Sequence, residues 1–302
     1  MKKVYALLSI ALLFFLGHAK GQTVKQLEKA YQKRSTVKLK RFFDDWAKDL
    51  RPATQDERSK MRNPIQQAYQ VFEVFYNPVD LKSRGGSEFG NRIYEGFNYF
   101  IIQNSFKIYQ KEKIHYTEQE AKAYAIDNIK KNAKRILYTE KRIASIESGD
   151  KYFLDLFGPD SKREWDDTER ILIDSVIDFR PNTIQTKGTP LYLSDKYKVL
   201  LDSFIGNNHV PFATGGIMNT AQATGGSADR QQFLQNYIKI FHGHWGGYWQ
   251  YYTYPTISSI VFDKDFKYAK AYYNMVYEGG EAFLVFEDNT WKLLSVQRTW
   301  IQ

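Results

Sequence analysis

The sequence predicts an α+β protein, with a mainly helical N-terminal half and a curved antiparallel sheet, a cone-like meander, in the C-terminal half. Apolar residues recur at spacings of three and four through much of the first half, as amphipathic helices require. The residues after 255 instead contain β-branched and tyrosine-rich segments separated by short turns. The composition, with 43% hydrophobic and 25% charged residues, is that of a globular protein.

Residues 1–21 have the three parts of a secretory signal peptide. Two lysines precede an apolar run from Val4 to Leu16, and Ala19 and Gly21 occupy the positions of a small-residue cleavage site. The run is shorter than the about 20 residues that a spanning helix needs, so we expect no transmembrane segment in the mature chain. The chain contains no cysteine, which excludes disulfides, thiolate chemistry and a cysteine-linked lipid anchor. The prediction is an exported protein, periplasmic or secreted, that is not lipid-anchored.

The mature chain divides into a mainly helical basic region, residues 22–150, and an α+β region, residues 151–302. An amphipathic helix is expected from Thr23 to Leu50, and two strands pairing around a turn are expected within Phe97–Tyr109. Basic residues outnumber acidic ones in the first region. In an exported protein this surplus favours an anionic envelope partner over nucleic acid, and a structural role in a cell-envelope assembly is one alternative. A solvated helical surface is the simpler explanation.

In the second region a helix is expected from Phe233 to Phe241, followed by strands near 256–262, 268–277, 281–286 and 291–300. Three of these segments, Ala269–Val276, Ala282–Phe286 and Trp291–Trp300, together resemble the C-terminal part of the nuclear-transport-factor-2-like (cone) fold. The resemblance implies a helix-backed sheet around a conical pocket. In that fold the pocket serves enzymes in some members and non-catalytic binding or assembly in others, so the fold alone does not fix a function.

The densest aromatic cluster of the chain lies between the helix and these strands. Six aromatic residues fall within positions 245–254, beside three glycines and two histidines. Aromatic rings with polar tips suit a ligand such as a carbohydrate or another small molecule. The predicted ligand-binding residues are His242, His244, Trp245, Trp249 and Tyr252. Two alternatives remain: the rings belong to the core and seal one end of the sheet, or His242 and His244 bind a metal, for which no third ligand lies nearby in sequence.

No catalytic motif occurs, so the favoured function is a non-catalytic binding or interaction module without catalytic residues, metal or cofactor. The alternative is a hydrolase or lyase in which His244 acts with Glu278 or Glu281 as acid and base. This alternative requires the groups to reach one pocket. The segment from Glu278 to Glu281 is predicted as a hairpin turn, where exposed glutamates are ordinary.

Overall fold

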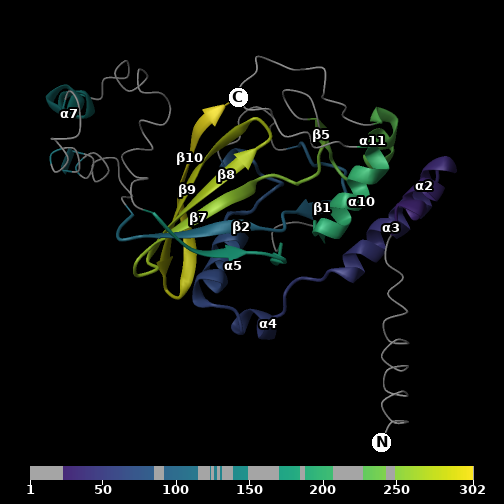
Figure 1. Cartoon of the computed structure of the whole chain (residues 1–302), viewed down its shortest axis with the longest axis horizontal. Helices are drawn as coiled ribbons and strands as arrows, with labels where there is room; N and C mark the ends of the chain where they lie inside the picture. Colours follow the sequence, from purple (N-terminus) through teal and green to yellow (C-terminus); the bar gives the residue numbers. More distant parts are fainter. Residues whose placement is uncertain are drawn as a thin grey trace, which may run out of the picture.

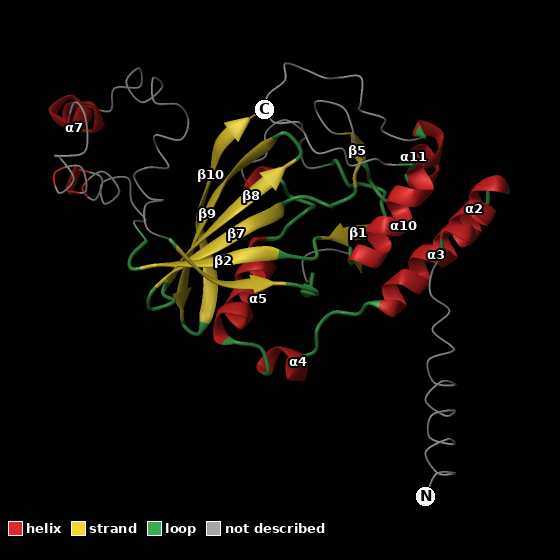
Figure 2. Ribbon diagram, in the orientation of Figure 1, coloured by secondary structure: helices red, strands yellow, loops and turns green. Residues whose placement is uncertain are grey.

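The computed structural model describes residues 23–84, 92–114, 139–148, 170–183, 188–206, 227–242 and 249–301, with isolated helical positions at 123, 126, 127 and 130. The predicted signal peptide lies outside the described residues. The α+β class is confirmed, with helices gathered in the first half and a sheet built mainly from the second (Figures 1 and 2). No helix within the described ranges is long and apolar enough to cross a membrane.

Two helices occupy the segment predicted as one helix from Thr23 to Leu50, and the single-helix prediction is wrong. Helix α2 (Val24–Gln32) ends where Arg34 takes a positive φ of 45°. Ser35 then caps α3 (Thr36–Asp49) by accepting a hydrogen bond from the Lys38 amide. A capping box of Thr54 and Glu57 opens α4 (Gln55–Ser59).

The main sheet has six strands in the order β10-β9-β8-β7-β2-β3. Its C-terminal strands form the predicted antiparallel meander, and only the contact between β2 and β7 is parallel. Helix α5 (Asn63–Phe75) packs against β10, β2 and β3, so it covers one face of the sheet (Figure 1). The strands are β2 (Phe106–Lys111), β3 (Ile171–Val176), β7 (Thr256–Asp263), β8 (Tyr268–Met275), β9 (Glu278–Glu287) and β10 (Thr290–Ile301). Because β2 precedes residue 150, both regions of the chain contribute to this sheet.

Strand β1 (Tyr99–Ile102) does not pair with β2, so the predicted hairpin around Asn104-Ser105 is wrong. It pairs in parallel with β4 (Thr189–Tyr192), far along the chain. All four residues of β1 are buried, because the strand separates two hydrophobic clusters. Phe100 and Ile102 join the cluster between α5 and the main sheet, whereas Tyr99 and Ile101 join the cluster among the helices. A strand buried on both faces cannot show the alternation that marks a half-exposed hairpin.

The second cluster packs α2 and α3 against α10 (Asp195–Ile205) and α11 (Ala228–Leu234). At its centre the Trp46 ring stacks on Tyr197 at 4.2 Å, and its Nε1 donates to the Tyr192 carbonyl at 3.1 Å. This packing fixes α3 beside β4, and therefore beside β1.

The helix predicted from Phe233 to Phe241 ends early. Helix α11 stops at Leu234, and Phe241 instead begins the short strand β5 (Phe241–His242), which pairs with β6 (Trp249–Gln250). The remaining described elements are the 3₁₀ turn η1 (Lys82–Arg84) and α7 (Thr139–Ser148).

Candidate ligand-binding site

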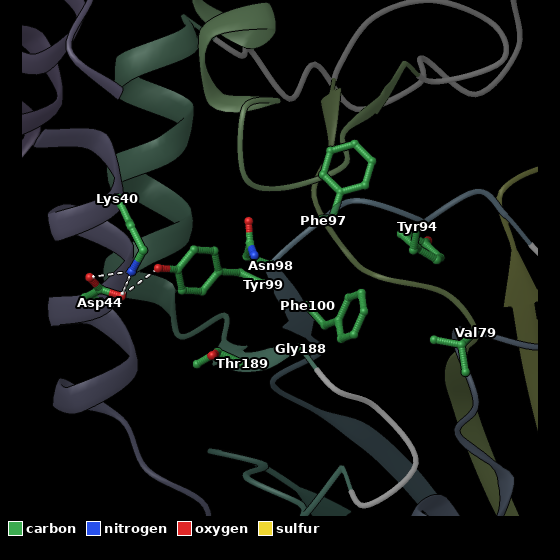
Figure 3. A pocket seen from close by; sticks show the side chains of 10 residues that line it. All are labelled: Lys40, Asp44, Val79, Tyr94, Phe97, Asn98, Tyr99, Phe100, Gly188 and Thr189. Carbon is green, nitrogen blue, oxygen red and sulfur yellow. Dashed lines mark hydrogen bonds and ion pairs between the residues drawn. The ribbon is translucent and has the colours of Figure 1, made fainter. Parts of the chain in front are cut away.

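A pocket of about 610 Å³ opens where α3 passes the start of β1. Its volume falls in the range of small-molecule sites, about 300–1,000 Å³. Side chains from α3, from the turn and extended segment leading into β1, and from the start of β4 surround it (Figure 3). The lining residues are Lys40, Asp44, Val79, Tyr94, Phe97, Asn98, Tyr99, Phe100, Gly188 and Thr189.

One side of the pocket is polar and rests on α3. Lys40 and Asp44 are one helical turn apart, and the Lys40 ammonium lies 2.9 and 3.0 Å from the two carboxylate oxygens of Asp44. The hydroxyl of Tyr99 donates to the same carboxylate at 2.6 Å. Asp44 is therefore held from two elements, the helix and the strand (Figure 3). These contacts fix the orientation of the carboxylate, while the Asp44 side chain remains 40% exposed.

Each of these three groups has a shifted pKa. Burial raises the pKa of Tyr99 to about 12, and its hydrogen bond to Asp44 adds to the shift. Burial also acts to raise the pKa of Asp44, but the hydrogen bonds from Tyr99 and Lys40 outweigh it and the pKa is lowered. The hydrogen bond to Asp44 raises the pKa of Lys40. At neutral pH the site therefore holds a carboxylate, an ammonium and a protonated phenol.

The other side of the pocket is aromatic, with Phe97, Phe100 and Tyr94 opposite the α3 pair (Figure 3). Phe100 and Tyr94 are almost fully buried and meet edge to face at 6.0 Å, so this wall is rigid. Phe97 is half-buried. Gly188 lies directly behind the Phe100 ring, since a Cβ at this position would be only 2.5 Å from a ring carbon.

Of the residues predicted to bind a ligand, Trp249 and Tyr252 are the two whose side chains the structure describes, and neither of them lines this pocket. Trp249 and Tyr252 are half-buried and pack against the helical cluster that also contains Tyr99. Burial raises the pKa of Tyr252, and the nearby acidic groups Asp195 and Asp202 raise it further. His242 ends strand β5, and its side chain, like residues His244 and Trp245, lies outside the described residues.

Phe241 and Tyr254, which are close in sequence to those residues, contact the lining residue Tyr94 from outside the pocket. Phe241 and Tyr254 pack against one another at 5.7 Å, and Phe241 also meets the Tyr94 ring at 6.3 Å. The Tyr254 amide donates to the Tyr94 hydroxyl at 2.7 Å. Tyr251 and Tyr254 are buried, as the alternative of a core role for these aromatics expects. The segment therefore contacts the pocket from behind through Tyr94.

Sequence reasoning missed the residues that do line the pocket. Lys40 and Asp44 have the spacing of an ordinary surface ion pair on a helix, which carries no ligand signal. The run from Phe97 to Phe100, three aromatics in four residues directly after Gly96, was a usable signal for an aromatic wall.

Glu278 and Glu281 lie on β9 rather than in a turn, and the prediction of exposed turn glutamates is wrong. Positions three apart on a strand point to opposite faces of the sheet. Glu278 is 1% exposed and pairs with Arg298 at 3.0 Å. Glu281 pairs with Lys270 at 3.2 Å on the other face, where burial lowers the lysine pKa to about 8. The two glutamates therefore cannot serve one site together.

No group of three histidine, cysteine or acidic residues is placed to hold a metal ion in the described part of the chain. Comparison with protein-family models, curated proteins and solved structures gives no match. The function therefore has to be inferred from the pocket itself.

Proposed function

We propose that this chain is an exported, non-catalytic binding module that holds a small organic molecule in the pocket between α3 and β1. The observation that carries the proposal is the pocket itself, which has a volume of about 610 Å³. An oriented ion pair lies on one side of it and a wall of packed aromatic rings on the other. Small-molecule sites commonly combine apolar walls with a few fixed polar groups. The export part of the proposal rests on the signal-peptide pattern of residues 1–21.

The protonation states favour binding over acid–base catalysis at this site. A general acid or base works best when its pKa lies near the working pH. The pKa of Asp44 is lowered and that of Tyr99 is raised to about 12, so both lie far from neutrality. Groups in fixed charge states hold a ligand by hydrogen bonds and do not exchange protons readily with it.

Saturation-transfer NMR of the mature chain with a library of small neutral, acidic and basic fragments tests the binding function. We expect at least one fragment to bind, and Phe97→Ala to reduce its affinity about tenfold because a stacking surface is lost. Phe266→Ala is the matched control, since Phe266 is also a half-buried phenylalanine and lies at the turn before β8. A library without any hit, or equal losses in the two variants, would contradict the proposal.

Sequencing the N-terminus of the protein recovered outside the cytoplasm tests export. Cleavage after Gly21 would leave Gln22 first, one residue before the N-cap Thr23 of α2. Recovery of the chain only from the cytoplasm, with Met1 intact, would contradict this part of the proposal.

A further inference from the structure

The described part of the pocket lining carries one positive and one negative side chain, and the two neutralise each other. Among the lining residues that the structure describes, Lys40 and Asp44 are the only charged ones. They are ion paired at 2.9 Å, with side chains that keep 51% and 40% of their exposure. An acidic ligand at this position would lie against Asp44, and a basic ligand would lie against Lys40. The charge balance therefore favours a neutral ligand over either ion.

The same pair offers donors and acceptors side by side. An ammonium has three protons and a carboxylate about four acceptor positions. The hydrogen bonds between Lys40, Asp44 and Tyr99 occupy only part of that capacity. A hydroxyl both donates and accepts, so two adjacent hydroxyls of a ligand match an ammonium beside a carboxylate. Asn98 and Thr189 add a side-chain amide and a hydroxyl to the lining of the pocket (Figure 3).

The aromatic wall supplies an apolar surface for the face of such a ligand that carries no hydroxyls. The C–H face of a pyranose ring is apolar although its rim is hydroxylated, and aromatic rings provide a large rigid apolar surface for it. Phe97 is half-buried and lines the pocket opposite the α3 pair (Figure 3). A ligand with an apolar face and a hydroxylated edge therefore matches both sides of the pocket.

From these features we infer that the ligand is a neutral carbohydrate, with its ring against Phe97 and two adjacent hydroxyls on Lys40 and Asp44. This inference rests on the proposed function, because it names the ligand class of the same pocket. This site differs from the one predicted at the aromatic cluster of residues 245–254 and its neighbouring histidines, since it lies on α3 and β1.

A matched panel of sugars tests the inference on the mature chain by saturation-transfer NMR. The neutral probes are glucose, galactose, mannose and N-acetylglucosamine, and the charged counterparts are glucuronate and glucosamine. We expect one or more neutral sugars to bind, and the charged counterparts to bind about tenfold more weakly because each meets a like charge.

Two substitutions invert the preference if the geometry is as inferred. Asp44→Asn leaves Lys40 without its carboxylate and should raise the affinity for glucuronate relative to glucose. Lys40→Met leaves Asp44 and should raise the affinity for glucosamine. Asp56→Asn is the control, because Asp56 on α4 and Lys60 directly after it form a similar ion pair four residues apart at 2.7 Å, and neither lines the pocket. This control should leave the preferences unchanged.

The outcomes separate the inference from the function on which it rests. Binding of other fragments without binding of any neutral sugar would overturn the carbohydrate inference and leave the binding function standing. Charged sugars that bind as tightly as neutral ones, or a preference that neither substitution alters, would overturn it as well. A chain that binds neither fragments nor sugars would contradict both.

Discussion

The hydroxyl of Tyr99 donates a 2.6 Å hydrogen bond to the carboxylate of Asp44, which joins β1 to α3 across the polar side of the pocket. The two residues are 55 positions apart in sequence. Their contact depends on the helical cluster, which contains Tyr99 together with Phe43 and Trp46 from the inner face of α3. The geometry of the candidate site is thus a consequence of core packing.

Replacing Tyr99 by phenylalanine should weaken the fold by about 1 kcal/mol at neutral pH, a modest value because Asp44 is partly exposed. The pH dependence of the stability is a more specific test of this hydrogen bond than its size at neutral pH. The folded-state pKa of Tyr99 is raised from about 10 to about 12. The protonated Tyr99 hydroxyl therefore contributes its full stabilisation of the fold below pH 10, and this stabilisation is lost as the pH rises towards 12. Urea unfolding between pH 9 and 12 should show a steeper loss for the wild type than for Tyr99→Phe. Parallel curves would contradict this assignment.

Glu57 should control part of the acid stability. Its hydrogen bond from Arg51 comes first among the causes that lower its pKa from 4.5 to about 2, followed by the bond from the Thr54 amide. Because the pKa of Glu57 is lower in the folded state, its ionised carboxylate stabilises the fold at pH values above the unfolded-state pKa of 4.5. This stabilisation is lost as the pH falls from 4.5 to about 2. Glu57→Gln should therefore reduce stability at pH 6 and have little effect at pH 2. An effect that is equal at both values would argue against this role.

The buried Glu278 should depend on Arg298. Arg298→Met removes a partner 3.0 Å from a carboxylate that is 1% exposed, whereas the arginine side chain itself is 40% exposed. We expect a loss of about 1–2 kcal/mol at neutral pH, below the cost for a fully buried pair because solvent screens the arginine. In chemical unfolding, the double variant with Glu278→Gln should recover part of the loss, and a double variant no more stable than Arg298→Met would contradict the pairing.

Gly188→Ala should damage the pocket and not merely the local backbone. Its Cβ would lie 2.5 and 2.7 Å from two carbons of the Phe100 ring, so the ring has to move within a packed wall. Overpacking of this kind costs about 1–3 kcal/mol. We expect a lower melting temperature together with loss of the fragments that bind the wild type. Unchanged fragment affinity would show that this wall does not contact the ligand.

Much of the fold could be predicted because its signals are local. The strands β7, β8 and β10 lie close to their predicted positions, since their apolar periodicity and turn residues are in the sequence itself. The pairing of β1 with β4 could not be predicted, because both partners are short strands from distant segments. The break at Ser35 was detectable from its capping character and from the lack of apolar residues between Tyr31 and Val37, yet the regular apolar spacing on either side favoured one helix.

The candidate site was harder to predict than the fold. The aromatic density of residues 245–254 drew attention to rings that, where described, pack largely into the core, such as Tyr251 and Tyr254. Lys40 and Asp44 acquire their significance only because α3 is placed beside Tyr99. The family resemblance to the cone fold stays a prediction, although the antiparallel meander that suggested it is confirmed.

Crystals of the mature chain soaked with the bound fragments or sugars give the most direct test of the central claim, that the pocket between α3 and β1 holds a small molecule. The account predicts electron density for the ligand between Phe97 and the Lys40–Asp44 pair, with polar ligand atoms within hydrogen-bond distance of both charged side chains. Ligand density at Trp249 and Tyr252 with an empty α3 pocket would contradict it.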